Sequence, residues 1–113
     1  MDVSVLVPLF NEAESLPSLH AWIVRVMKEH ALSYEIVFVN DGSNDDSWQV
    51  IQSLREQDEH VKGICFRRNY GKSAALHCGF QMVQGDVVIT MDADLQDSPD
   101  EIPELYRMIK EDG

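Results

Sequence analysis

The sequence predicts an α/β fold, with a parallel sheet of about four strands and alternating helices. A short apolar run, a polar turn and a helical stretch follow one another four times along the chain. The apolar runs are nearly continuous and rich in β-branched residues, which is typical of parallel strands covered on both faces. Strands that alternate with helices imply right-handed crossovers. The 113 residues suit one domain at most.

The elements follow from the spacing of apolar residues. The predicted strands cover residues 3–10, 34–39, 61–66 and 87–91. The predicted helices cover about 15–30, about 43–57, about 73–84, and the chain from about 100 onward. Ser43 and Asp46 have the spacing of a capping box for the second helix, and Gly85 would end the third. The apolar positions at helical spacing are Leu16, Leu19, Ile23 and Met27; Val50, Ile51 and Leu54; Leu76, Phe80 and Val83; and Ile102, Leu105 and Ile109.

The charge, the cysteines and the hydrophobicity of the chain argue against several classes of function. The chain has 20 acidic and 9 basic residues, a formal charge of −11. This argues against nucleic-acid binding as a global mode, because phosphate contacts need a basic face. Cys65 and Cys78 lie in apolar stretches and are predicted to be buried thiols in a reducing compartment. No apolar run approaches the roughly 18 residues of a membrane helix, and the start lacks a signal-peptide pattern, so a cytoplasmic protein is expected.

The polar residues with chemical potential follow the strands and do not precede them. The loops after the strands hold Asn11-Glu12 and the segments 40–43, 67–72 and 92–97. The loops before the strands, at 31–33, 59–60 and 85–86, are plain. In an open parallel sheet, ligands bind beyond the carboxyl ends of the strands. The functional edge is therefore predicted to be the carboxyl edge.

Asp92-Ala93-Asp94 is the sharpest of these features. Two carboxylates follow an apolar strand directly, where their repulsion and desolvation would cost several kcal/mol without a partner. A divalent cation removes that cost, and oxygen ligands suit Mg²⁺ or Mn²⁺. Gln96 could add a carbonyl oxygen. The alternative is an ordinary turn cluster, since Asp is common in turns.

A second feature is a basic cluster in an otherwise acidic chain. Arg67, Arg68 and Lys72 lie within six positions, and Lys72 stands where a helix begins, so the cluster could bind a phosphate. The alternative is a solvated charge cluster. Asp41 ends the second strand and could accept hydrogen bonds from a base or a ribose, or could form a simple Asp-Gly turn.

Four motifs occur together in a characteristic order: 8–12 (PLFNE), 39–43 (VNDGS), 69–72 (NYGK) and 92–97 (DADLQD). With them the chain resembles the family 2 glycosyltransferases of GT-A fold. Within that family it is most similar to the polyprenyl-phosphate sugar transferases, such as bactoprenol glucosyltransferases and dolichol-phosphate mannose synthases. The resemblance covers essentially the whole chain. Ser98 stands where members of this subgroup usually have Pro, a departure that affects only a turn.

The resemblance implies a Rossmann-like half that binds a nucleotide sugar, with strand order 3-2-1-4, and roles for the matched residues. Lys72 would lie near the diphosphate, and Asp92 and Ala93 near the ribose and diphosphate. Asp94 and Gln96 would bind Mg²⁺ or Mn²⁺, with Asp92 close by. The remaining donor-nucleotide residues would be Pro8, Phe10, Asn11, Glu12, Val39 and Asp41.

The implied activity is metal-dependent transfer of a sugar from a UDP- or GDP-sugar to a lipid-phosphate or glycan acceptor. The family's catalytic half continues past Gly113 and supplies the base, so residues 1–113 are expected to be a truncated donor-binding part without catalytic residues. The full-length protein would be associated with the cytoplasmic face of a membrane. The alternative is a non-catalytic module that binds nucleotide or metal. The strand at 87–91, apolar and at the edge of this half-sheet, would favour self-association.

Two other enzyme classes share the α/β shape. Aspartyl phosphatases and phosphoacceptor domains place an acid at the end of the first strand, where this chain reads Leu9-Phe10-Asn11-Glu12. Sugar nucleotidyltransferases place a glycine-rich loop there. The sequence favours neither, and no serine or cysteine lies in a nucleophile-elbow pattern.

Overall fold

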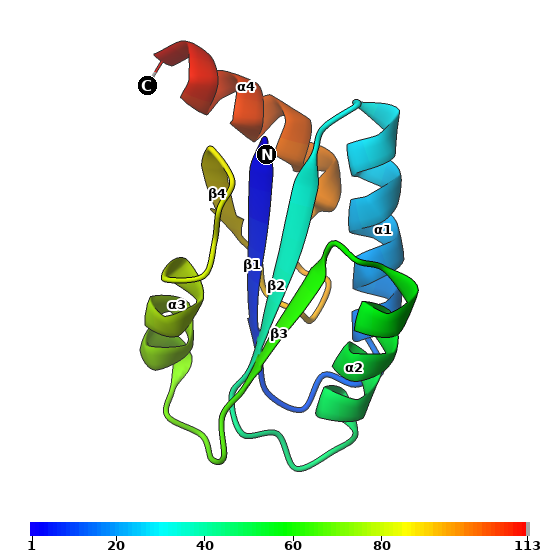
Figure 1. Cartoon of the computed structure of the whole chain (residues 1–113), viewed down its shortest axis with the longest axis vertical. Helices are drawn as coiled ribbons and strands as arrows, with labels where there is room; N and C mark the ends of the chain where they lie inside the picture. Colours follow the sequence, from blue (N-terminus) through cyan, green and yellow to red (C-terminus); the bar gives the residue numbers. More distant parts are fainter. Residues whose placement is uncertain (113) are drawn as a thin grey trace.

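The computed structural model describes residues 1–112 and confirms the predicted α/β fold; Gly113, the last residue of the predicted domain, lies outside the described residues. A parallel sheet with the order β3-β2-β1-β4 lies between helices (Figure 1). The elements are β1 (Val3–Leu9), α1 (Leu16–Glu29), β2 (Tyr34–Asn40), α2 (Ser47–Gln57), β3 (Val61–Cys65), α3 (Lys72–Phe80), β4 (Val87–Thr90), the short 3-10 helix η1 (Pro99–Glu101) and α4 (Ile102–Asp112).

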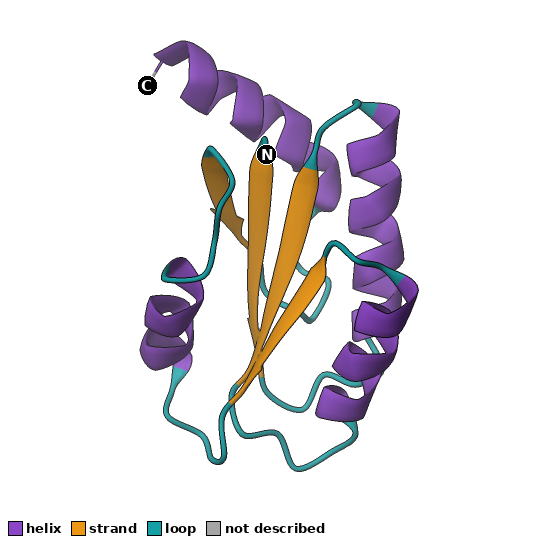
Figure 2. Ribbon diagram, in the orientation of Figure 1, coloured by secondary structure: helices purple, strands orange, loops and turns teal. Residues whose placement is uncertain are grey.

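The sheet has a core on each face, because neighbouring residues of a strand point to opposite sides. On one face, Val3, Val5 and Val7 of β1 pack with apolar residues of α1, α2 and α4. On the other face, Leu6 of β1 packs with Ala75 of α3. Figure 2 shows the resulting layers, with α3 on one side of the sheet and α1 and α2 on the other. This double covering explains why β1 and β2 are buried along their whole length.

β1 and β4 separate before β1 ends. Their parallel pairing runs from Val3↔Val87 to Leu6↔Thr90, whereas β1 stays paired with β2 as far as Leu9↔Asn40. Pro8, which has no N–H to donate, therefore lies where pairing with β4 has already ended. The order of strands changes direction at β1, so a crevice opens at the topological switch point where α/β proteins bind ligands.

The third helix is shorter than predicted. α3 ends at Phe80 instead of about residue 84, and its last residue is followed by Gln81 in the capping position, so the assignment of Gly85 as a helix cap was wrong. Gly85 instead approaches β1 closely. Its N–H donates to Ser4 Oγ at 2.8 Å, and a Cβ on it would lie 2.6 Å from the Ser4 nitrogen.

The predicted apolar stripe of α3 was also wrong in part. Phe80 is 50% exposed, while Ala75 and Gly79 are the buried positions. A Cβ at Gly79 would lie 2.2 Å from Leu6 Cδ1, so α3 approaches the sheet through its smallest residues. Small residues allow this close approach, which the spacing of large apolar residues does not reveal.

Two further local predictions were wrong. The proposed capping box fails because α2 begins at Ser47, and Ser43 Oγ accepts instead from the Asn11 N–H at 2.9 Å. Of the two cysteines expected to be buried, Cys65 is exposed and Cys78 is intermediate. Cys65 is the last residue of β3, which lies at the edge of the sheet.

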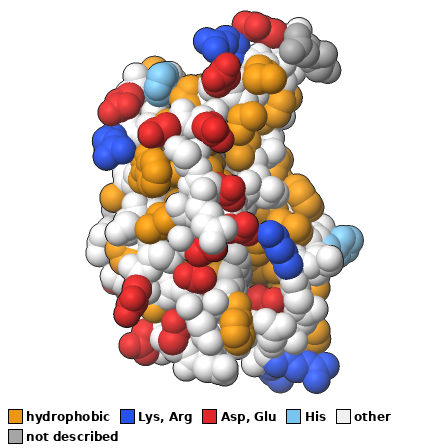
Figure 3. Space-filling model, turned by 180° about the vertical axis from the view of Figure 1, so that it is seen from behind, with side chains coloured by type: hydrophobic (Ala, Val, Ile, Leu, Met, Phe, Trp, Pro, Cys, Tyr) orange, Lys and Arg blue, Asp and Glu red, His pale blue; other side chains and the backbone are white. Residues whose placement is uncertain are grey.

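α4 extends past the sheet, so only its first turn is buried. Ile102 is 0% exposed, but Leu105 and Ile109, predicted to continue its apolar stripe, are 38% and 47% exposed. Figure 3 shows hydrophobic side chains along this helix, next to scattered acidic ones. Within residues 1–112, none of the helices combines the length and the apolar character that a membrane crossing requires.

The amino edge of the sheet carries a buried polar network that the plain loops did not predict. Glu35, 1% exposed, accepts from Ser4 Oγ at 2.5 Å and from the Gln84 N–H at 2.6 Å. Lys62 Nζ lies 2.6 Å from its other carboxylate oxygen. Burial by itself raises the pKa of Glu35, but the hydrogen bonds from Lys62, Ser4 and a backbone N–H outweigh it, so the pKa is lowered. Glu35 thus fastens the connection between α3 and β4 to the sheet.

Candidate functional site

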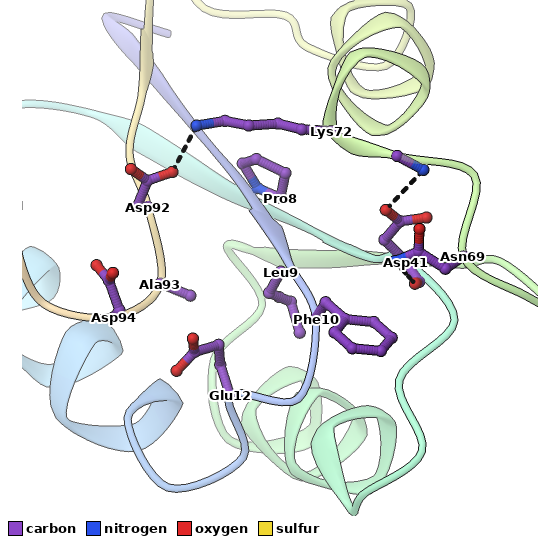
Figure 4. Close-up of a pocket in the computed structure, with 11 residues that line it drawn as sticks. Pro8, Leu9, Phe10, Glu12, Asp41, Asn69, Lys72, Asp92, Ala93 and Asp94 are labelled. Carbon is purple, nitrogen blue, oxygen red and sulfur yellow. Dashed lines mark hydrogen bonds and ion pairs between the residues drawn. The ribbon is translucent and has the colours of Figure 1, made fainter.

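A cavity of about 360 Å³ opens at the carboxyl edge, over the crevice between β1 and β4. The polar loops that follow the strands converge on it (Figure 4). Eight of the predicted site residues line it: Pro8, Phe10, Glu12, Asp41, Lys72, Asp92, Ala93 and Asp94. Leu9, Asn69 and Gly71 complete the lining.

Asn11 lies outside the lining and organises the loop that holds Phe10 and Glu12. Its backbone has φ of 54°, a left-handed conformation that Asn tolerates better than most residues. Its Oδ1 accepts from the backbone N–H groups of Asn44 at 2.7 Å and Asp45 at 3.3 Å. The loop after β1 is thereby joined to the loop after β2.

Val39 and Gln96 also lie outside the lining. Val39 is 0% exposed within β2 and packs in the core on the α3 face. Gln96 is exposed, and its backbone N–H donates to Asp94 Oδ1 at 3.1 Å. Val39 is therefore a core residue of the sheet, and Gln96 is an exposed residue that follows Asp94 without lining the cavity itself.

One end of the cavity is rich in carboxylates. Asp92 and Asp94 follow β4, and Glu12 reaches toward them from the loop after β1 (Figure 4). Lys72 crosses from α3 and places its Nζ 2.8 Å from Asp92 Oδ1. This ion pair, with the charges of Asp97 and Asp94, raises the pKa of the Lys72 amine. The end is thus acidic overall, with one cation across it.

The donor set at this end suits a divalent cation, although its side chains are not gathered around a common point. Asp92, Asp94 and Glu12 offer hard oxygen ligands of the kind that Mg²⁺ and Mn²⁺ prefer. Among the residues described, no three His, Cys, Asp or Glu side chains form a ready metal site. Lys72 meanwhile occupies one oxygen of Asp92. The chemistry of these residues fits the ion, and an ion bound at Asp92 Oδ1 would take the place of Lys72 there.

The other end of the cavity is less charged and has an aromatic wall. The Phe10 ring is 42% exposed and lies across from Asp41 and Asn69 (Figure 4). An exposed aromatic ring beside polar groups can receive the flat face of a base. Asp41 is 5% exposed, and its carboxylate accepts from the N–H groups of Tyr70 at 2.8 Å and Gly71 at 3.0 Å.

Ser15, just before α1, links two of the loops that form the acidic end. Its hydroxyl lies 2.5 Å from the carbonyl oxygen of Ala93 and 3.2 Å from Glu12 Oε2. The hydroxyl donates to Ala93, because that contact is the shorter one. Ser15 therefore connects the loop after β1 to the loop after β4. No short sequence motif predicted this role.

The three basic residues of the predicted phosphate patch do not act together. Lys72 lines the cavity, whereas Arg67 and Arg68 are absent from the lining. The Arg68 guanidinium lies 4.8 Å from the centre of the Tyr70 ring. Asn69 and Gly71, which do line the cavity, stand in the same sequence motif as Lys72 and could have been selected with it.

The sequence matches a known family along nearly its whole length. Residues 4–113 match the family described as Glycosyl transferase family 2. Undecaprenyl-phosphate 4-deoxy-4-formamido-L-arabinose transferase of Pseudomonas fluorescens (strain SBW25) is 46% identical over 104 residues, 91% of this chain and 30% of the relative. The same-named protein of Proteus mirabilis (strain HI4320) is 43% identical over 110 residues, 96% and 34% of the two chains. The chain spans about a third of these relatives.

Solved structures share the fold. S. aureus TarS 1-349 superposes with a TM-score of 0.75 at 20% identity, covering 98% of this chain and 33% of that one. A mannosyltransferase from Pyrobaculum calidifontis, in complex with GDP-Man and Mn²⁺, gives 0.73 at 24% identity, covering 96% and 31%. The fold of this chain is therefore that of GT-A glycosyltransferases.

Proposed function

The chain belongs to glycosyl transferase family 2, and we propose that it binds the nucleotide-sugar donor and the metal ion of a sugar transfer. The observation that carries this proposal is one cavity at the switch point of the sheet, with carboxylates at one end and an exposed aromatic ring at the other. A nucleoside diphosphate has the matching order of parts, a flat base followed by a charged diphosphate.

The acidic end supplies the metal ligands in this proposal. Asp92 and Asp94 would hold Mg²⁺ or Mn²⁺, and the exposed Gln96 could add its side-chain carbonyl oxygen. Bound there, the ion would neutralise charge that develops on the departing diphosphate. A solved structure that shares this fold contains Mn²⁺ together with GDP-Man, which supports the choice of ion.

The other residues bind and orient the donor. Lys72, released from Asp92, would pair with a diphosphate oxygen, since an ammonium group beside a helix start attracts anions. Phe10 would lie against the base, with Pro8, Glu12 and Asp41 around the nucleoside and Ala93 beside the ribose. Asn11 and Val39 would act from outside the cavity, by holding the loop after β1 and the end of β2.

The acceptor belongs to the same proposal. The curated relatives are named as transferases to undecaprenyl phosphate, which supports a polyprenyl phosphate over a glycan. With such an acceptor, the whole protein would work at the cytoplasmic face of a membrane, and its catalytic base would come from outside residues 1–113. We also propose that the exposed edge at β4 allows self-association.

Calorimetric titration of UDP and of GDP tests the proposal, each in Mn²⁺ buffer and in EDTA. One of the two should bind in the presence of Mn²⁺, and EDTA should abolish that binding. Equal affinity in both buffers would exclude the metal role, and no binding of either nucleotide would overturn the donor site.

A second candidate is a module that holds nucleotide and metal without turnover. It is favoured by one observation, that the chain spans about a third of the relatives it matches. Transfer assays with UDP- and GDP-sugars separate the two. Residues 1–113 should bind donor without transferring sugar, and a protein of the relatives' length that contains them should transfer it.

A further inference from the structure

The segment between β3 and α3 is fastened to the end of β2 by Asp41. The Asp41 carboxylate accepts two successive backbone N–H groups, that of Tyr70 at Oδ1 and that of Gly71 at Oδ2. Its backbone carbonyl accepts from Asn69 Nδ2 at 3.2 Å. Three consecutive residues of the segment are therefore bonded to this one residue, which is itself 5% exposed.

Gly42 packs closely against the backbone of the same segment. Its φ is +71°, and a Cβ on it would lie 2.1 Å from the carbonyl carbon of Arg68 and 2.4 Å from the nitrogen of Asn69. Within the segment, the Tyr70 ring lies 4.8 Å from the Arg68 guanidinium and 5.6 Å from the Phe66 ring. The segment is thus packed on Gly42 and has contacts of its own, ahead of the first residue of α3.

That first residue is Lys72, whose side chain is mostly open to solvent. Its side chain is 62% exposed, yet its Nζ crosses the cavity to within 2.8 Å of Asp92 (Figure 4). The reach of an exposed side chain depends on where its backbone is fixed. Here the backbone is fixed at the preceding residue, Gly71, by the Asp41 carboxylate.

We propose that Asp41 is a positioning residue, which sets Lys72 against the acidic end of the cavity and so contributes to binding the diphosphate. This rests on the proposed donor site and assigns Asp41 a role through Lys72 instead of through the base alone. Accepting both N–H groups at once requires two acceptor oxygens, which a carboxylate provides. An amide in its place would face one of the two N–H groups with its own NH₂.

The test compares three probes bound in Mn²⁺ buffer: inorganic pyrophosphate, the nucleoside diphosphate that binds better (UDP or GDP), and the corresponding free nucleoside. Asp41→Asn should weaken the binding of pyrophosphate about tenfold, as expected when one charge-assisted hydrogen bond to the diphosphate is removed, and should weaken the nucleoside diphosphate at least as much. The free nucleoside has no diphosphate, so its loss of affinity measures separately any contact that Asp41 makes with the nucleoside. A weakening confined to the probes that contain a base would overturn the proposal.

A double-mutant cycle separates positioning from a merely structural effect. In a Lys72→Met background, Asp41→Asn should cause no further loss of pyrophosphate affinity, because the residue it positions is gone. An equal loss in both backgrounds would overturn the proposal. Asp58→Asn is the matched control. This carboxylate also accepts a backbone N–H, that of His60 at 2.9 Å, but at the opposite edge of the sheet, and its loss should leave all three affinities unchanged.

Hydrogen exchange tests the same claim without ligand. The amide hydrogens of Tyr70 and Gly71 should exchange faster in Asp41→Asn than in the unmodified chain, and unchanged rates would overturn the positioning role. If the unmodified chain binds none of the three probes, the donor site itself is wrong, and with it the contribution of Asp41 to diphosphate binding.

Discussion

At the residue scale, the two aspartates after β4 have different surroundings. Asp92 is paired with Lys72, whereas Asp94 is exposed and accepts only the backbone N–H of Gln96 among the hydrogen bonds of the described chain. Asp94 is therefore the carboxylate most available to an incoming cation. In the proposed metal site, Asp92 would exchange its ion pair with Lys72 for contact with the metal ion.

Asp94→Asn should weaken Mn²⁺-dependent nucleotide binding roughly tenfold or more, because a neutral amide is a poorer ligand for a hard cation. Calorimetry in Mn²⁺ buffer measures it. Asp100→Asn is the control, since this carboxylate bonds Trp22 Nε1 at 2.8 Å outside the cavity. Retained affinity in Asp94→Asn would remove Asp94 from the metal site.

The buried Glu35 predicts a pH dependence of stability. Its pKa in the folded chain is lowered, so the carboxylate stabilises the fold fully above its unfolded pKa of about 4.3. That contribution is lost as pH falls through the lower, folded pKa. Lys62→Met should lower the free energy of unfolding at pH 7 by about 2–3 kcal/mol, since a buried carboxylate loses its partly exposed cation.

Urea unfolding at pH 7 and at pH 3 measures this effect, and the difference between Lys62→Met and the unmodified chain should shrink at the lower pH. Lys110→Met is the matched control. Lys110 pairs with Asp86 at 3.7 Å with both side chains about half exposed, and its loss should change stability by at most about 0.5 kcal/mol. A Lys62→Met variant as stable as this control would show that Glu35 does not depend on its cation.

At the scale of elements, the site is assembled by contacts between loops that follow different strands. Asn11 joins the loops after β1 and β2, Ser15 joins those after β1 and β4, and Asp41 joins those after β2 and β3. The helices contribute little to the lining beyond Lys72. Changes to these loops should therefore alter the proposed donor site even where the changed residue touches no ligand.

Gly42→Ala tests one such contact. The added Cβ would meet the backbone of Arg68 at 2.1 Å in a conformation that L side chains rarely adopt, so the loops must move apart. We expect a loss of about 1–3 kcal/mol in the free energy of unfolding, together with weaker donor binding. Thermal unfolding and calorimetry measure the two effects.

Gly71→Ala is the comparison, because its φ is +100° but a Cβ there would meet nothing within 4 Å. The loss of stability in Gly71→Ala measures the free-energy cost of placing Ala at a positive φ without a steric clash. This loss should be smaller than that in Gly42→Ala. If the two variants lose the same stability, the close approach at Gly42 contributes nothing beyond its φ.

At the scale of the whole molecule, a strand edge and an apolar helix face are open to solvent near β4. Among the strands of residues 1–112, β4 pairs only with β1, and the exposed face of α4 carries Leu105, Met108 and Ile109. Unpaired strand edges recruit other chains, above all when no charge interrupts them. The structure thus agrees with the predicted edge position of the strand, and self-association remains a proposal.

We expect residues 1–113 to sediment as a concentration-dependent mixture larger than a monomer. Thr90→Lys, a charge on an exposed residue of β4, should shift the mixture toward monomer. Ile89 is unsuitable for this purpose, because it is 7% exposed in the core and a charge there would unfold the protein.

Met108→Lys on α4 is the parallel variant, and it shows whether association uses the helix face instead of the strand. A monomer at all concentrations in the unmodified chain would contradict the proposal of an exposed, associating edge.

The fold and most of the cavity lining were predictable from the sequence, because both depend on local pattern. The four apolar runs predicted the strands to within a residue or two, and the ends of those strands predicted where Asp41, Asp92 and Asp94 would meet. The errors fell at the end of α3, at the start of α2 and along α4. The end of α3 depended on its close approach to β1, and the start of α2 depended on the contact between Ser43 and Asn11. The exposure of α4 depended on how far the sheet extends beneath it.

By itself, the sequence determined the alternation of strands and helices, the edge of the sheet at which the polar loops meet, and the residue types that line the cavity there. The periodicity of a strand and the position of a loop depend on residues that are close in sequence, and parallel strands bring their carboxyl ends to one edge. Only the tertiary structure decided that Lys72 pairs with Asp92, that Glu35 is buried beside Lys62, and that Asp41 holds the loop before α3. These contacts join residues 20 to 30 positions apart, and their distances depend on how separate elements pack.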